Sequence, residues 1–169
     1  NAGGVIGNIS RHLALLGIPV KLVSVLGNDP DGDWLLQDCR QFGITDEHIL
    51  RVDENTGKYA SVLNEDGTLF VAACADECSK YIDPAFLQHQ SGLLETASLI
   101  ITDTNISEDA LAWLTAFSRE KSIPLIIEPV SVAKARKLSH IDISGVFMIT
   151  PNEDELSSVC KYNYENSRS

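Results

Sequence analysis

The chain has 169 residues, of which 44% are hydrophobic and 22% are charged, which is enough for one globular domain with a sizeable core. Its formal net charge of -11 argues against a nucleic-acid partner, because nucleic-acid backbones are bound through patches of Lys and Arg. No apolar run is long enough to span a bilayer, so we expect no membrane partner. No basic-then-apolar signal segment stands at the start of the sequence.

The first part of the chain alternates between helical spacing of apolar residues and short β-prone runs. Gly and Pro residues mark the ends of these runs, and an Asn-Asp-Pro-Asp cluster marks a turn. The expected elements, in chain order, are a helix over 8–16, a strand over 20–26, a turn over 27–32 and a helix over 34–42.

A different pattern follows, typical of a β-hairpin. Two short β-prone runs, over 59–64 and 69–73, are joined by Glu65-Asp66-Gly67, which is hairpin chemistry. A hairpin inserted after a β-α pattern predicts a flap beside the main sheet, over about residues 56–73.

Four cysteines stand at Cys39, Cys74, Cys78 and Cys160. Cys74 and Cys78 have the spacing of half a zinc site, but no second ligand pair follows, and none of the four histidines has zinc-like spacing to them. We therefore expect free thiols in a reducing cytosol.

The second half alternates regularly between strands and helices. This alternation predicts parallel βαβ units with right-handed crossovers, hence an α/β fold. The expected strands span 99–102, 125–127 and 146–150, and the expected helices span 108–121 and 131–138, with a last helix beginning near 153. We expect one domain over 1–160 and a polar tail over 161–169.

The glycines at the start of the chain are candidate ligand contacts. Gly3 and Gly4 precede a helix, where small residues let a ligand approach unpaired backbone N–H groups. Asn8 adds a donor and an acceptor for sugar hydroxyls, although a tight turn with a helix cap explains the same residues structurally. No GxGxxG fingerprint and no GxxxxGK[ST] loop is present, so an unrelated nucleotide-binding α/β domain is the weaker alternative.

Polar residues follow each strand of the second half. In open α/β sheets ligands bind beyond the carboxyl ends of strands, which makes these residues site candidates. They are Asp103 and Asn105 after the first strand, Glu128 after the second, and Asn152 and Glu155 after the third. The last two stand three residues apart at a helix start, and a carboxylate there can hold Mg²⁺ through water.

Helix capping is the structural alternative for these positions. Asn105 or Ser107 can cap the helix over 108–121, and Asn152 with Glu155 can form a capping box with exposed acids.

Taken together and in this order, several motifs resemble the ribokinase (PfkB) family of small-molecule kinases, up to about Cys160. The resemblance implies a ribokinase-like three-layer αβα fold with a mainly parallel central sheet and a small β lid. The motifs are Gly3-Gly4-x-x-x-Asn8, Leu15-Leu16-Gly17, Val25-Leu26-Gly27-Asn28-Asp29-x-x-Gly32 and Thr150-Pro151-Asn152-x-x-Glu155.

The resemblance also implies roles for single residues in the first half. Gly3, Gly4 and Asn8 would line the sugar pocket, whereas the turn at Asp29 is interpreted as structural. The lid would cover the substrate and pair with the lid of a second subunit, which implies a homodimer. Tyr59 or a neighbour would contact the substrate there, unless Tyr59 simply packs on the sheet.

In the second half, the resemblance implies that Asn152 orients the phosphates of ATP and that Glu155 holds Mg²⁺ through water. The family usually has Asp-Pro where this chain has Glu128-Pro129, so the longer side chain shifts the carboxylate and leaves its role near the phosphates open.

The implied activity is that of an ATP-dependent carbohydrate or nucleoside kinase that uses Mg²⁺. Asp103-Thr-Asn-Ile-Ser107 and Glu128-Pro-Val-Ser-Val-Ala-Lys-Ala-Arg-Lys137 are most similar to pseudouridine kinases, which transfer the ATP γ-phosphate to the 5′-hydroxyl of pseudouridine. The family's Gly-Ala-Gly-Asp motif, which supplies the base and the anion hole, is absent, and after Gly92 the only glycine is Gly145. We therefore expect a fragment that holds the substrate-binding portion and assign no catalytic residue to it. The alternative is a non-catalytic module for ligand binding or dimerisation.

Overall fold

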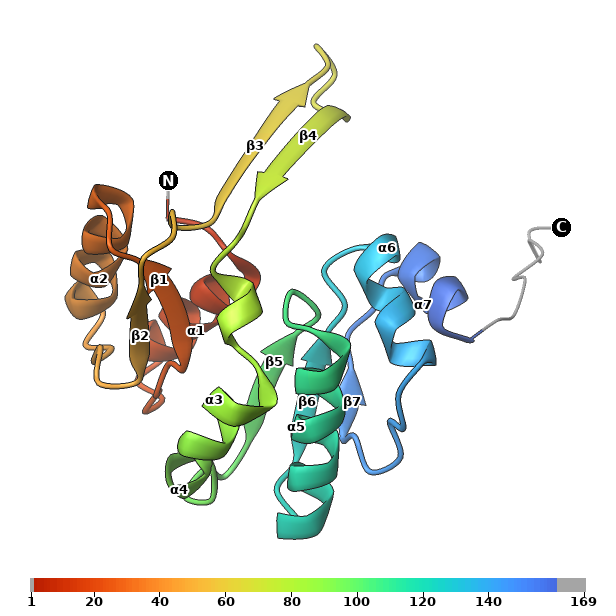
Figure 1. The fold of residues 1–169 in the computed structure, drawn as a ribbon. Helices are drawn as coiled ribbons and strands as arrows, with labels where there is room; N and C mark the ends of the chain where they lie inside the picture. Colours follow the sequence, from red (N-terminus) through yellow and green to blue (C-terminus); the bar gives the residue numbers. More distant parts are fainter. Residues whose placement is uncertain (1, 161–169) are drawn as a thin grey trace, which may run out of the picture. The chain divides into compact units, whose positions relative to one another are not determined.

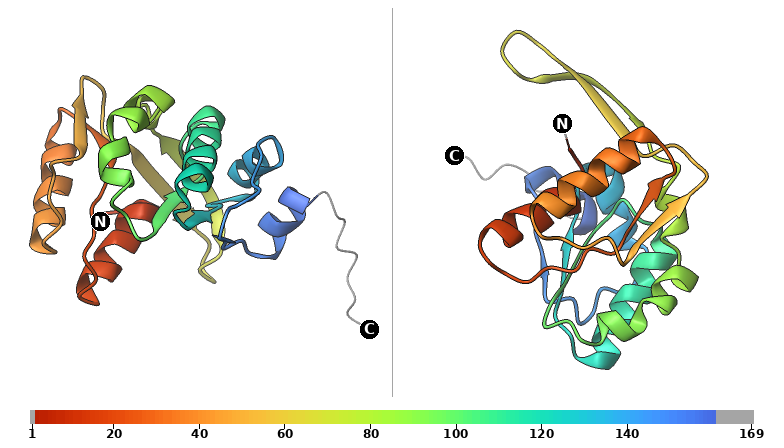
Figure 2. Two further views of the ribbon diagram at one scale, coloured as in Figure 1. Left: turned by 90° about the horizontal axis from the view of Figure 1, so that it is seen from below. Right: turned by 90° about the vertical axis from the view of Figure 1, so that its left-hand side faces the viewer.

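The computed structural model describes residues 2–160 and is shown in Figure 1, with two further views in Figure 2. The chain forms two compact units, Asn1–Ile82 and Asp83–Ser169. Each unit carries parallel β-strands connected by helices, which confirms the expected α/β fold.

In unit 1, helix α1 is followed by a β-α-β arrangement in which two short strands pair in parallel, with Ser24 opposite Ile49. Its core is formed by Leu22, Cys39 and Ile44, against which the neighbouring helices pack apolar side chains. The elements are α1 (Val5–Leu15), β1 (Ser24–Gly27), α2 (Pro30–Gln41) and β2 (Ile49–Val52).

Helix α2 begins where the sequence supplies a cap. The side chain of Asp29 accepts a hydrogen bond from the backbone N–H of Gly32 at 2.8 Å, and Pro30 occupies the first turn. The helix therefore starts four residues earlier than the apolar spacing predicted, because spacing locates only the buried face and not the polar first turn.

The expected hairpin is present as β3 (Lys58–Leu63) and β4 (Leu69–Ala75), which pair antiparallel. Its turn is closed by the N–H of Asn64, which donates to the carbonyl of Thr68 at 2.8 Å, and Gly67 there has φ of 83°. A register shift lies between Val62 and Leu63. The ribbon extends away from β1 and β2 (Figure 1), and a short 3-10 helix, η1 (Ser79–Tyr81), follows it.

Unit 2 is built on a three-stranded parallel sheet in the order β5-β6-β7. Its central strand is the most deeply buried, since Leu125 and Ile127 expose no surface, and α5 adds the fully buried Leu111. The elements are α3 (Pro84–His89), α4 (Ser91–Leu94), β5 (Ile100–Asp103), α5 (Glu108–Lys121), β6 (Leu125–Glu128), α6 (Val132–Ala135), the 3-10 helix η2 (Arg136–Ser139), β7 (Met148–Ile149) and α7 (Glu153–Cys160).

Two predicted strands are longer in the sequence pattern than in the structure. The run over 20–26 forms a strand only from Ser24, because its partner β2 offers four residues for pairing. The run over 146–150 is reduced to Met148–Ile149, although the N–H of Phe147 and of Thr150 still donate to β6 carbonyls. Apolar β-prone residues therefore mark the region of a strand, whereas its length depends on its neighbour.

In unit 2 the helical predictions differ from the structure at three places. The helix expected over 131–138 is divided into α6 and the 3-10 helix η2, and α3 and α4 were not predicted. The start of α3 did carry a signal, because Asp83 caps it through the N–H of Phe86 at 2.7 Å and Pro84 follows. Strand β2 was also missed, since its four residues show no distinctive alternation.

Candidate functional site

The polar residues that follow the strands of unit 2 meet at one edge of its sheet. Asp103 ends β5 and stands in register with Glu128, which ends β6. The hydroxyl of Thr150, just after β7, donates to the carboxylate of Glu128. The β7–α7 turn that leads to Asn152 is thus joined to the same edge, as expected for carboxyl ends of parallel strands.

Asp103 orients the side chain of Asn105. One carboxylate oxygen of Asp103 accepts from the backbone N–H of Asn105 at 2.9 Å, and the other accepts from its Nδ2 at 2.7 Å. The Oδ1 of Asn105 accepts from Nζ of Lys134. Ser107, not Asn105, caps α5 by accepting from the N–H of Ala110 at 3.1 Å, so the capping alternative holds for Ser107 only.

Glu128 bridges two segments of the edge. One of its oxygens accepts from the backbone N–H of Val130 at 3.3 Å, and the other accepts from Thr150. Val130 has φ of 67°, a rare conformation for a β-branched residue, and the N–H of Ser131 donates across it to Pro129 at 2.7 Å. The longer side chain of Glu128, compared with Asp, is thus used in contacts within the chain.

Asn152 and Glu155 form a reciprocal capping box at the start of α7. The N–H of Asn152 donates to Glu155 Oε2 at 3.0 Å, and the N–H of Glu155 donates to Asn152 Oδ1 at 2.9 Å. This is the geometry of the structural alternative, but the acid is not exposed, since Glu155 is 5% accessible. A role of Glu155 in binding Mg²⁺ stays a prediction, and within residues 2–160 no three His, Cys, Asp or Glu side chains gather as a metal site.

In unit 1, the glycines at the start of α1 face open space. Gly4 precedes the helix with φ of 82°, a conformation that favours glycine, and a Cβ at Gly3 or Gly4 would meet no atom within 4 Å. Asn8 is exposed on the first turns of α1. Its Oδ1 accepts from Arg11, which also pairs with Asp38 at 2.7 Å. Arg11 was missed, because one Arg in a helix carries no distinctive sequence signal.

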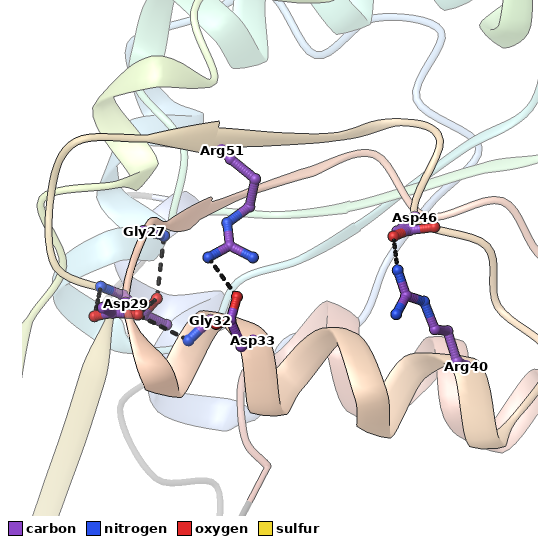
Figure 3. A network of polar contacts seen from close by, with 8 residues as sticks. Gly27, Asp29, Gly32, Asp33, Arg40, Asp46 and Arg51 are labelled. Atoms are coloured by element: carbon purple, nitrogen blue, oxygen red, sulfur yellow. Dashed lines mark hydrogen bonds and ion pairs between the residues drawn. The ribbon is translucent and has the colours of Figure 1, made fainter.

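Asp29 forms the polar junction shown in Figure 3, as the structural interpretation of its turn predicted. Its carboxylate accepts from the N–H of Gly32, and from the hydroxyl of Thr56 at 2.6 Å and the N–H of Thr56 at 2.8 Å. The Thr56 Oγ1 in turn accepts from the N–H of Gly27 at 3.1 Å. These hydrogen bonds, with that of the Thr56 hydroxyl as the largest contribution, lower the pKa of Asp29 to about 2.

The glycines of this junction are required by close packing. A Cβ at Gly27 would lie 2.1 Å from the carbonyl oxygen of Glu54, and one at Gly32 would lie 2.4 Å from the carbonyl oxygen of Gly27. Because Thr56 lies two residues before β3, the junction ties the base of the hairpin to the β1–α2 turn.

Tyr59 lies on β3 opposite Cys74 and exposes 65% of its surface. It therefore does not pack into the core of unit 1, and its ring is accessible to a ligand or to a second chain. All four cysteines are free thiols, and the Sγ of the buried Cys78 donates to the carbonyl of Asn55 at 3.1 Å.

A hollow of about 470 Å³ in unit 2 lies at the opposite ends of the strands from these polar residues. It is lined by residues that precede β6 and β7, among them Pro124, Val146 and Phe147, and by the end of α5. None of the site residues expected from the sequence lines it. Over residues 2–160, no helix has the length and apolar character needed to cross a membrane.

Comparison with known proteins identifies relatives over most of the chain. The pfkB family carbohydrate kinase profile matches residues 1–167. The pseudouridine kinase of Escherichia coli strain K12 is 33% identical over 158 residues, which are 93% of this chain and 50% of that enzyme.

Solved structures show the same fold. A carbohydrate kinase from Agrobacterium tumefaciens superposes with a TM-score of 0.80 at 26% identity, over 93% of this chain and 52% of that protein. Arabidopsis thaliana ribokinase complexed with ribose and ATP superposes with a TM-score of 0.80 at 20% identity, over 98% of this chain and 53% of that protein. The chain thus spans about half the length of these relatives. A ribokinase-like fold and a profile match over nearly all residues lead to one assignment: the chain belongs to the pfkB family of carbohydrate kinases.

Proposed function

We propose that the chain is the substrate-binding portion of an ATP-dependent sugar or nucleoside kinase whose acceptor is the 5′-hydroxyl of pseudouridine. Membership of the pfkB family and the likeness to the Escherichia coli pseudouridine kinase support this reading. The observation that carries it is the pairing of Asp103 with Asn105 at the carboxyl edge of the unit 2 sheet. A carboxylate and an amide held side by side match the donors and acceptors of a hydroxylated ligand.

Each unit by itself offers candidate groups for substrate binding. Gly3 and Gly4 expose backbone at the open N-terminus of α1, and Asn8 adds an exposed amide on the same helix. Asp103 and Asn105 supply the corresponding polar groups in unit 2, and Tyr59 supplies an exposed ring. Each of these assignments is a proposal about binding, with no residue assigned to the chemical step.

ATP and Mg²⁺ would meet the chain at the ends of β6 and β7. Asn152 and Glu128 lie there beside the turn into α7, and Glu155 adds a carboxylate oxygen at the helix start. These oxygen donors suit Mg²⁺, which binds one or two carboxylates and keeps several of its waters. The metal, when bound with ATP, would neutralise phosphate charge during transfer. Asn152 would help orient the phosphates, and Glu155 would act on the metal through water.

The hairpin would act as a lid over the substrate and as the contact between two subunits of a homodimer. Its two strands expose apolar side chains, with Phe70 71% accessible and Val62 57% accessible, as expected of a surface that meets a partner. Closing such a lid excludes water, which protects the phosphoryl donor from hydrolysis. We place the lid at about 56–73, within a partial kinase domain over 1–160, in a protein of the cytoplasm.

A second candidate is a module that binds ligand or dimerises without catalysis. It is favoured by the exposed apolar side chains of the hairpin, which can contact a second chain without any chemical step. Both candidates share the same ligand site and differ only in turnover.

The test combines binding and turnover on the chain itself. Calorimetry with pseudouridine, uridine and ribose should show binding of pseudouridine in preference to uridine. A phosphorylation assay with pseudouridine, ATP and Mg²⁺ should show no product, because no catalytic base is assigned within the chain. Turnover would contradict the assignment as a substrate-binding portion alone. Absence of binding to all three ligands would overturn the proposed function.

A further inference from the structure

Lys137 makes an unusual pair of contacts beside the candidate site. It lies in η2 of unit 2, and its Nζ donates to the backbone carbonyl of Thr104 at 2.9 Å and to that of Ile106 at 2.7 Å. These are the residues on either side of Asn105. One ammonium group therefore fixes the main chain immediately before and immediately after the amide that we assign to substrate binding.

Lys137 donates to two backbone carbonyls that lie between β5 and α5, outside the hydrogen bonding of either element. Thr104 uses its N–H to reach the carbonyl of Glu128 at 3.0 Å, and Ser107 caps the helix that follows. The carbonyls of Thr104 and Ile106 lie between these two fixed points, in a loop whose side chains are largely buried. A buried carbonyl without a partner is costly, and an ammonium has three donors to offer.

The partly buried position of Lys137 is consistent with a fixed contact. Burial lowers the pKa of its ammonium, and the positive charge of Lys134 lowers it further, while Glu108 and Asp103 act in the opposite direction. The ammonium of a surface lysine without a fixed partner normally remains solvated, because the flexible side chain can extend into water.

The amide of Asn105 is held from both sides by charged groups. Its Nδ2 donates to Asp103 at 2.7 Å, and its Oδ1 accepts from Lys134. A carboxylate can only accept and an ammonium can only donate, so these two partners allow one orientation of the amide. Lys134 and Lys137 stand three residues apart, in the consecutive elements α6 and η2, and both contact the same loop.

We propose that Lys137 is a positioning residue that, through the carbonyls of Thr104 and Ile106, fixes the loop in which Asn105 meets the substrate. Lys134 and Asp103 set the rotation of the amide, and Lys137 sets its location. The link from the loop to substrate affinity rests on the proposed function, whereas the order of the loop itself does not.

The test compares Lys137→Met with Lys121→Met in the full chain. Both variants remove one lysine charge from unit 2 and keep an apolar stem, but Lys121 pairs with Glu95 at the other end of α5. By NMR without ligand, we expect Lys137→Met to raise amide hydrogen exchange at Thr104 and Asn105 by roughly tenfold or more and to shift the Asn105 side-chain amide signals. Lys121→Met should change neither.

Lys137→Arg is the conservative variant, since it keeps the charge and several donors. It should restore slow exchange in the loop at least in part. If the proposed function holds, the pseudouridine dissociation constant should rise roughly tenfold in Lys137→Met and less in Lys137→Arg.

Separate outcomes decide the two proposals. Unchanged loop exchange and unchanged Asn105 signals in Lys137→Met would overturn the positioning role, whatever the ligand does, and so would a Lys137→Arg variant no better than Lys137→Met. A wild-type chain that binds no nucleoside or sugar would overturn the proposed function alone. Should Lys137→Met unfold, the NMR signal of the Lys137 Nζ protons in the wild-type chain tests the contact with the loop instead. A resolved, slowly exchanging signal supports the contact and its absence contradicts it.

Discussion

At the scale of single residues, several polar side chains at the candidate site form hydrogen bonds with the backbone. Glu128, Asn152 and Glu155 all use carboxylate or amide oxygens to accept backbone N–H groups next to the ends of strands. A ligand at this edge would therefore meet groups whose orientation is already fixed, which reduces the entropy lost on binding.

Asn8 is the residue with which the proposed sugar site in unit 1 is most directly tested. Asn8→Ala removes an exposed amide, so we expect pseudouridine affinity to fall at least several-fold with little change in folding. Calorimetry measures the affinity, and His12→Ala, one turn later on the exposed side of α1, serves as the control. An unchanged affinity in folded Asn8→Ala would remove this residue from the site.

Asp29 gives a prediction for pH. Its pKa is about 2 in the folded chain and 3.8 when unperturbed, so its stabilising effect is complete above 3.8 and is lost as the pH falls toward 2. The free energy of unfolding of unit 1, followed by denaturant titration at several pH values, should drop over this window. Asp29→Asn should reduce that dependence without abolishing it, because the pKa values of Asp46, Glu54 and Asp66 are also lowered by hydrogen bonds. Asp53→Asn, at an exposed position of the same unit, should retain the full dependence. A wild-type profile that is flat between these pH values contradicts the role of the junction.

At the scale of elements, helix α5 shows the closest agreement between sequence and structure. It spans Glu108–Lys121 as expected, with acids in its first turn and Arg119 and Lys121 in its last. Ser107 provides the cap, and apolar residues at helical spacing provide the buried face. All the signals that define a helix are local here, which is why its bounds could be predicted.

Ser107→Ala should lower the free energy of unfolding by about 1 kcal/mol, because the N–H of Ala110 loses its acceptor. Chemical denaturation measures this, and Ser98→Ala, at an exposed position outside any helix, should have little effect. Ser107→Asp should keep most of the stability, since Asp also caps. Equal stability of the wild type and Ser107→Ala would show that the cap contributes nothing.

The elements that sequence reasoning missed or misjudged depend on contacts distant in the chain. Strand β2 has no pattern of its own and exists because β1 pairs with it, and β7 is short because only two residues align with β6. By contrast, the carboxyl edge of the unit 2 sheet could be predicted from strand order, because Asp103, Asn105 and Glu128 each follow or end a strand that the sequence indicates. The contacts of Thr56 and Lys137 could not, because both reach residues more than twenty-five positions away.

At the scale of the whole molecule, exposed apolar side chains mark where another surface would bind. Phe70 and Val71 expose 71% and 51% of their surfaces on a two-stranded ribbon, which is at best marginally stable alone in water. The proposed pairing of two such ribbons would bury them and stabilise the hairpin at the same time.

The double substitution Phe70→Ser with Val71→Ser should weaken self-association at least about tenfold. Sedimentation velocity over a range of concentrations measures the association. Leu16→Ser changes an equally exposed apolar residue, 75% accessible, outside the hairpin and should leave the association unchanged. A wild-type chain that is monomeric at all concentrations, or a double variant that associates as strongly as the wild type, contradicts dimerisation through the ribbon.

The attachment of the ribbon has a mechanical consequence. The N–H and the hydroxyl of Thr56 both donate to Asp29, which fixes the chain just before β3. Gly57 is the first residue after this contact. A Cβ at Gly57 would lie 3.0 Å from Oδ1 of Asp76, which directly follows β4. A larger residue at this position would therefore press the two strands apart at the base of the ribbon, far along the chain from the turn at Gly67.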